Sequence, residues 1–143
     1  MTVRSILNAK GADVATIDPR ASLADAAHML AARRIGAIVV KGPANSVAGI
    51  LSERDIVRAV STYGAASLDR TVDETMTREV VTCEAKDSIN AVMEKMTAGK
   101  FRHVPVVDHN KLVGIISIGD VVKARLAQME SETRALQDYV AGS

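Results

Sequence analysis

The sequence predicts a mixed α/β (α+β) fold in which two β-α-β-β-α repeats pack as a pseudo-twofold pair, followed by an extended C-terminal helix. Three observations predict it: a seven-residue pattern that occurs twice, apolar runs that share its spacing, and a last helical pattern too long for the repeat. The chain has 143 residues, 48% hydrophobic and 2% aromatic, so its core must be mainly aliphatic. Because one repeat alone would bury only a marginal core, we expect the two sheets to pack face to face around a shared one.

The duplicated pattern is Gly, two aliphatic residues, Ser, two variable residues and Asp. It spans Gly49–Asp55 and recurs at Gly114–Asp120, an offset of 65 (114 − 49). Val14–Asp18 aligns with Val80–Glu84 at an offset of 66 (80 − 14). Because the register survives helical and strand patterns alike, the chain is interpreted as an internal duplication. The predicted divisions are repeat 1 (1–62), a linker (63–70), repeat 2 (71–126) and a helical extension (127–143).

Repeat 1 alternates strand and helix signals. Ser22 predicts the N-cap of a helix whose apolar positions recur at spacings of three and four, and Gly36 is expected to end that helix. The apolar run Ala37–Val40 is typical of a strand buried on both faces. The expected elements are a short helix at 3–7, a strand at 14–17, a helix at 22–34, strands at 37–40 and 47–51, and a helix at 52–61.

Repeat 2 repeats this order. The expected elements are a short helix at 72–76, a strand at 80–83, a helix at 88–98, strands at 103–107 and 112–116, and a helix from 118 onward. The last helix carries a stripe spaced 4, 3, 4, 3, 4: Val122, Leu126, Met129, Thr133, Leu136 and Val140. A stripe with this spacing is typical of a helix that pairs with another helix, and the alternative is a helix that folds back on its own repeat.

The composition and net charge of the chain argue against several classes of protein function. A net charge of +1 without long runs of one sign, and few aromatic residues, argue against nucleic-acid binding. No apolar run is long enough to span a membrane, and the N-terminus lacks a signal-peptide pattern, so we expect a soluble cytoplasmic protein. The single Cys83 can form no internal disulfide, and we interpret it as a buried structural thiol, the alternative being a reactive one. The three histidines lack metal-ligand spacing, so no metal site is expected.

The Ser-x-x-Asp at the end of each pattern has two interpretations. It can be a capping box, as Ser22 to Asp25 is expected to be. It can also mark an anion or nucleotide site, because the first N–H groups of a helix point outward at such a corner. Taken singly, each copy favours the cap. Two copies in equivalent places favour a pair of related sites.

In this arrangement the chain resembles the tandem cystathionine β-synthase (CBS) domain pair, and in particular small stand-alone bacterial proteins of that kind. The resemblance covers about Thr2 to Leu126. The residues that carry it are Gly49–Asp55, Gly114–Asp120, Val72–Thr77 and Phe101–Asp108. It implies clefts between the repeats that bind adenine nucleotides, and dimers of flat, disc-like shape. AMP is the ligand expected first, with ADP, ATP, NAD and S-adenosylmethionine as other candidates.

The resemblance also implies roles for residues at the two corners. Asp55 and Asp120 would hold ribose hydroxyls, Ser52 and Ser117 would lie by the phosphate, and Ile50 and Ile115 would lie against the adenine. The Asp55 cleft would be completed by Val80, Val81, Thr82, Phe101, Arg102 and His103. The Asp120 cleft would be completed by Val14, Ala15, Thr16, Gly36, Ala37 and Ile38.

The two clefts are therefore expected to differ. Arg102 and His103 bring cationic or hydrogen-bonding groups to the first, whereas Gly36 and Ala37 offer only room at the second. Lys10 could supply the missing cation to a phosphate there, or it could be an exposed loop lysine. Arg54 could likewise reach a phosphate or be solvated.

Function is expected to be regulatory and non-catalytic: a homodimer, or a higher oligomer, that senses an AMP-type nucleotide and signals to an unknown protein by a change of shape. The rival is a structural or interaction module with empty clefts. An enzyme is disfavoured because no nucleophile oriented by a base can be recognised.

Overall fold

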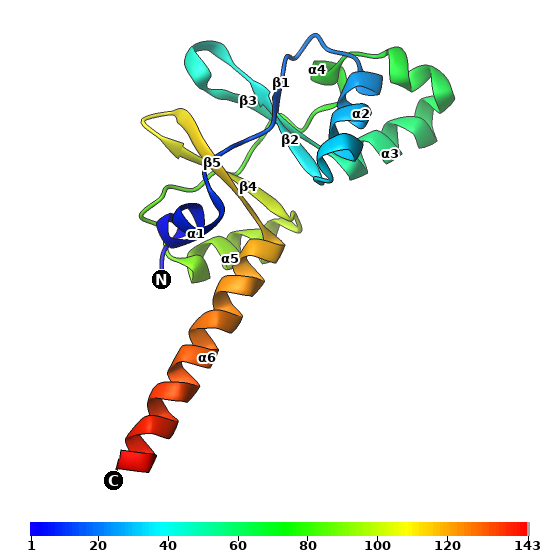
Figure 1. Ribbon diagram of the computed structural model, residues 1–143. Helices are drawn as coiled ribbons and strands as arrows, with labels where there is room; N and C mark the ends of the chain where they lie inside the picture. Colours follow the sequence, from blue (N-terminus) through cyan, green and yellow to red (C-terminus); the bar gives the residue numbers. More distant parts are fainter. Residues whose placement is uncertain (143) are drawn as a thin grey trace.

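The computed structural model describes residues 1–142 and contains two α+β halves, with a long helix that leaves the second (Figure 1). The predicted fold class is confirmed. The elements are α1 (Val3–Lys10), β1 (Thr16–Ile17), α2 (Leu23–Arg33), β2 (Ala37–Lys41), η1 (Pro43–Asn45), β3 (Val47–Ser52), α3 (Glu53–Tyr63), η2 (Gly64–Asp69), α4 (Val72–Thr75), α5 (Ile89–Gly99), β4 (His103–Asp108), β5 (Lys111–Ser117) and α6 (Ile118–Gly142).

The two sheets are small and follow the predicted order. In repeat 1, β1 lies parallel to β2, and β2 pairs antiparallel with β3; in repeat 2, β4 pairs antiparallel with β5. The strand predicted at 80–83 is wrong: only Cys83 bridges to Val106. The equivalent β1 is also shorter than predicted and begins at Thr16. The reason is that Val80 and Val81 line a cleft instead of pairing in a ladder.

The predicted helix caps are present. Ser22, Ser52 and Ser88 each accept the N–H of the third residue that follows. The helix predicted at 22–34 is present as α2, but Gly36 does not terminate it, because the C-cap is Arg34, in the left-handed region at φ 54°. Lys100 caps α5 in the same way at φ 57°.

Each half has its own buried core, and the expectation of one shared core is therefore wrong. The core of repeat 2 includes Val3 and Ile6 of α1, and the core of repeat 1 includes Val72 of α4 and Met76, which caps that helix. The short helix that begins each repeat thus packs on the core of the other repeat. Reciprocal backbone bridges fix this exchange: Thr2 pairs with Ser88, and Ser22 with Thr71.

The glycine that opens each duplicated pattern makes room for the exchanged helix. A Cβ at Gly49 would lie 2.5 Å from Met76 Sδ and 2.8 Å from the Thr77 carbonyl oxygen. A Cβ at Gly114 would lie 2.7 Å from Leu7 Cδ2. Only glycine permits these approaches without a shift of the neighbours, so the exchange brings the end of α1 or α4 next to the following Ser-x-x-Asp corner.

Candidate ligand-binding clefts

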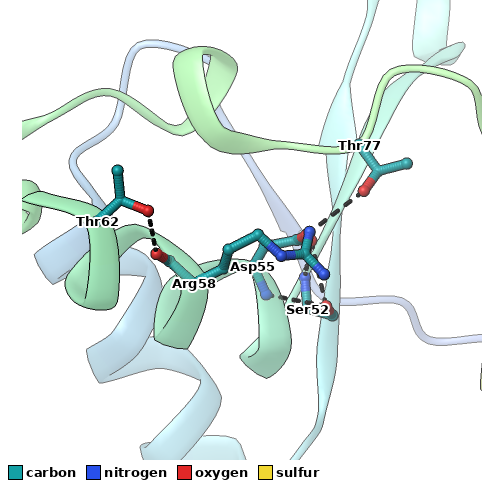
Figure 2. A network of polar contacts seen from close by, with 5 residues as sticks. All are labelled: Ser52, Asp55, Arg58, Thr62 and Thr77. Atoms are coloured by element: carbon teal, nitrogen blue, oxygen red, sulfur yellow. Dashed lines mark hydrogen bonds and ion pairs between the residues drawn. The ribbon is translucent and has the colours of Figure 1, made fainter.

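The first Ser-x-x-Asp corner joins β3 to α3 and forms a capping box. Asp55 Oδ2 accepts the Ser52 backbone N–H at 2.9 Å and the Ser52 hydroxyl at 3.1 Å, while Ser52 Oγ accepts the Asp55 N–H at 3.4 Å. Figure 2 shows Thr77 reaching the same carboxylate from the far side. The capping interpretation is therefore correct for this corner.

The cap leaves one carboxylate oxygen of Asp55 with weaker contacts. Oδ1 accepts the Thr77 hydroxyl at 3.4 Å and lies 3.6 Å from Arg58 Nη1. The Arg58 side chain is 75% exposed, so water screens this ion pair. A carboxylate has about four acceptor positions. Oδ1 can therefore accept new hydroxyl donors without the loss of the cap.

A cleft of about 530 Å³ opens beside Asp55, within the roughly 300–1,000 Å³ typical of ligand sites. Its walls come from both repeats and are rich in charge. Its lining residues are Gly36, Ser52, Glu53, Arg54, Asp55, Arg58, Thr77, Glu79, Gly99, Lys100, Phe101, Arg102 and His103. An adjoining hollow adds the apolar side chains of Ala37, Ile50, Val80 and Val81. The site thus combines a carboxylate, several cations and an apolar wall.

The second corner joins β5 to α6 and has a different carboxylate environment. Asp120 Oδ2 accepts the Ser117 N–H at 2.9 Å and forms an ion pair with Lys10 Nζ at 2.7 Å. Burial raises the pKa of Asp120, but the hydrogen bonds from Lys10 and Ser117 outweigh it and hold that pKa below its ordinary value. Lys10 was expected at a phosphate or in solvent; here it contacts the carboxylate instead. It comes from the end of α1, just as Thr77 follows α4 at the first corner.

A second cleft, of about 470 Å³, opens beside Asp120. Its lining residues are Lys10, Asp13, Val14, Ala15, Arg33, Arg34, Ile35, Gly36, Ala37, His103, Ile115, Ser117 and Asp120. The sequence suggested that this cleft would be poor in cations. That expectation is wrong, because Arg33 and Arg34 at the end of α2 line it. Lys10 is already engaged by Asp120, so these two arginines are the cations left to face the cleft.

His103 lies between the two clefts and lines both. The space beside Gly36, expected to be open, is taken up by this ring: a Cβ at Gly36 would lie 3.2 Å from His103 Cε1 and 3.3 Å from Glu53 Oε1. Burial, with the nearby cations Lys10 and Arg102, lowers the pKa of His103, and the opposing effect of Asp120 and Glu53 does not restore it. The ring is therefore a neutral hydrogen-bonding group at pH 7.

The structure brings most of the sequence-predicted residues to the clefts but leaves three outside. Ile38 is fully buried in the core of repeat 1, because alternate residues of β2 point away from the cleft. Thr16 lies in β1 and pairs with Val39 of β2. Thr82 offers its carbonyl to Lys95 Nζ at 3.0 Å. None of the three lines either cleft.

Several lining residues were missed from the sequence. Arg34 and Lys100 are equivalent at the repeat offset of 66 (100 − 34), and both are left-handed helix ends, so the repeat alignment could have found them. Thr77 carries no comparable signal, because its approach to Asp55 depends on how α4 docks on repeat 1. Arg58 lies three residues after Asp55 on α3, so the helical spacing could have found it. The remaining missed residues are Asp13, Arg33, Ile35, Glu53, Glu79 and Gly99.

Other candidate chemistry is limited in the part of the chain that is described. Cys83 is 2% exposed, and burial raises its pKa to about 11, which identifies a buried structural thiol. Across residues 1–142, no group of three or more His, Cys, Asp or Glu side chains is placed to hold a metal ion. None of the described helices is long and apolar enough to cross a membrane.

Comparisons with known proteins agree with this architecture. The chain is 50% identical to the CBS-domain containing protein ATU1752 from Agrobacterium tumefaciens, with a TM-score of 0.83 over 87% of this chain and 92% of that one. It is 26% identical to the CBS domain pair of protein MJ0100, solved with 5′-methylthioadenosine and S-adenosyl-L-methionine, with a TM-score of 0.80 over 90% and 98% of the two chains.

A relative in Arabidopsis thaliana, the mitochondrial CBS domain-containing protein CBSX3, is 33% identical over 122 residues. The match covers 82% of this chain but 59% of that protein. The family model described as CBS domain matches residues 3–62 and again 72–127. With both repeats matched and the paired architecture in place, the chain belongs to the CBS domain family.

Proposed function

We propose that this chain is a non-catalytic regulatory module that senses an adenine nucleotide of the AMP type in the Asp55 and Asp120 clefts. One observation carries the proposal: each cleft sets a carboxylate at a helix N-terminus against cations contributed by the other repeat. A ribose cis-diol donates hydrogen bonds that a carboxylate accepts, whereas a phosphate would be repelled by it. The helix N-terminus and the arginines suit the phosphate.

The proposed pose uses chemically matched surfaces in each cleft. Asp55 or Asp120 holds the ribose, and Ile50 or Ile115 packs against the adenine. Ser52 with Arg54 and Arg102 faces the phosphate in the first cleft. In the second cleft, Ser117 with Arg33 and Arg34 faces the phosphate. ADP, ATP, NAD and S-adenosylmethionine share the adenosine part and are ligands of the same class.

The proposed signal is a change in the angle between the repeats. Residues of both repeats line each cleft, so a ligand that bridges them binds one angle better than others, and that difference in affinity shifts the population. The module acts as a homodimer or a higher oligomer and passes the change to a protein target. The apolar groove between α2 and α3, where Val57 is 67% exposed, supports this assembly.

Isothermal titration calorimetry with AMP, ADP, ATP, NAD and S-adenosylmethionine tests the proposal. Asp55→Asn and Asp120→Asn keep a side-chain oxygen for the cap but remove the charge, and each is expected to abolish one site. Asp25→Asn is the matched control, since Asp25 has the same Ser-x-x-Asp spacing at the exposed start of α2.

Two outcomes would count against the proposal. Absence of heat and of a thermal shift at millimolar nucleotide would leave the rival, an interaction module with empty clefts. Wild-type binding by both cleft variants would remove the roles of the two aspartates. Small-angle scattering with and without AMP tests the change of shape separately.

A further inference from the structure

Helix α6 extends far beyond the body of repeat 2, and Figure 1 shows its last turns projecting away from both sheets. It has 25 residues, of which Val121 alone is buried. The apolar side chains of Val122, Leu126, Met129 and Leu136 are 47%, 55%, 52% and 65% exposed. The alternative in which this helix folds back on its own repeat is therefore wrong.

We propose that the exposed stripe of α6 is an interaction surface for a second copy of this chain, and that the two α6 helices pair in parallel and in register. The stripe alternates spacings of three and four, which is the pattern of a coiled-coil seam. In heptad positions, Leu126 and Thr133 occupy a, and Val122, Met129 and Leu136 occupy d. Most helical stability in proteins comes from the packing of an amphipathic face, so the projecting turns of α6 are expected to gain stability from a partner helix.

The polar member of the stripe favours the parallel arrangement. In a parallel pair Thr133 faces Thr133 of the second copy, so one polar layer stacks on itself and the apolar layers match. The Thr133 hydroxyl already donates to the Met129 carbonyl at 2.9 Å, so this layer buries no unpaired donor. An antiparallel pair instead places Thr133 against an apolar residue, Met129 or Val122 according to the overlap.

Charges beside the stripe also suit a parallel pair. Arg125, at position g, comes within reach of Glu130, at position e of the second copy, and the symmetry forms this attractive pair twice. The next such pair, Glu132 with Gln137, has only one charged member and so adds neither attraction nor repulsion between charges. An antiparallel pair of the same overlap would set Glu130 against Glu130 and Glu132 against Glu132, which repel. A shorter antiparallel overlap avoids this repulsion but leaves Leu136 beside Gly119, with no apolar side chain to cover it.

Disulfide trapping of the full chain tests both the pairing and its direction. Leu136→Cys places a thiol at a central d position, where a parallel pair brings the two copies within disulfide distance. Ser131→Cys, at the outward f position, is the matched control, and native Cys83 is buried and does not interfere. We expect rapid dimer formation under mild oxidation for Leu136→Cys and at least tenfold slower formation for Ser131→Cys.

Equal rates for the two variants, or no cross-linked dimer with Leu136→Cys, would overturn the proposal, and an antiparallel pair would give the second result. Charge reversal provides an independent measure. Arg125→Glu and Glu130→Arg alone should each weaken dimerisation about three- to fivefold, and the double variant should restore it. Failure of restoration would overturn the parallel register.

The pairing of α6 and the binding of nucleotide can be tested independently of each other. The stripe lies outside both clefts, so Leu136→Cys is expected to bind AMP like the wild type in its reduced form. Loss of trapping with normal titration would reject only the pairing of α6, whereas trapping without any titration would reject only the nucleotide sensor.

Discussion

Replacing Lys10 with methionine removes the ammonium group that contacts Asp120 at 2.7 Å. The two side chains are 32% and 23% exposed, so the pair is worth more than a fully solvated one but is still partly screened. We expect the free energy of unfolding at pH 7 to fall by about 1 kcal/mol. That corresponds to roughly 3–4 °C in melting temperature for a chain of this size.

The pH dependence of this loss follows from the pKa of Asp120. In the folded chain this pKa is held below its ordinary value of 3.8. The stabilisation is therefore complete above the unfolded pKa and disappears as pH falls through the folded one. Thermal unfolding of wild type and Lys10→Met should differ at pH 7 and converge in acid. Lys111→Met, at an exposed position on β5, is the matched control.

Adenosine binding by the Lys10→Met variant is the second assay, after thermal unfolding. It is measured in an Asp55→Asn background, so that only the Asp120 cleft binds. A ribose that hydrogen-bonds to both Asp120 oxygens must displace the Lys10 ammonium group. The Lys10→Met variant should therefore bind adenosine up to about fivefold more tightly, the equivalent of 1 kcal/mol. AMP should gain less than adenosine if the displaced Lys10 moves to the phosphate. An unchanged melting temperature at pH 7, together with weaker adenosine binding, would refute the reasoning.

Three further predictions concern residues outside this ion pair. Gly49→Ala should destabilise the chain by about 1–3 kcal/mol, because its Cβ meets a backbone carbonyl, and Gly114→Ala should cost less, because its Cβ meets a flexible leucine side chain; equal losses in urea unfolding would contradict this. The lowered pKa of His103 means that the unfolded chain takes up a proton first as pH falls below about 6.5. Wild type should therefore lose more stability than His103→Gln between pH 7.5 and 5.5, and parallel thermal curves would disprove it. Cys83, with its pKa raised to about 11, should react with a thiol reagent at pH 8 only after unfolding; rapid reaction of the native chain would show an accessible thiolate.

Patterns that depend on neighbouring residues were predicted well from the sequence. The serine caps at Ser22, Ser52 and Ser88, and the duplicated order of helices and strands, follow from interactions within about four residues and from apolar periodicity. One failure shows where such local patterns stop being informative. An apolar run at Val80 and Val81 resembles a strand, but these side chains line a cleft, and no pattern within the run distinguishes the two.

The sequence by itself therefore determined two repeats, two Ser-x-x-Asp corners and a long last helix with an apolar stripe. Only the tertiary structure decided what faces those corners. Lys10 and Asp120 are 110 positions apart, and they meet because α1 docks on the core of repeat 2. The docking of α4 on repeat 1 brings Thr77, a neutral hydroxyl, to Asp55 instead. The physical reason is that exchanged packing joins residues distant in sequence, so two similar motifs acquire unequal electrostatic environments.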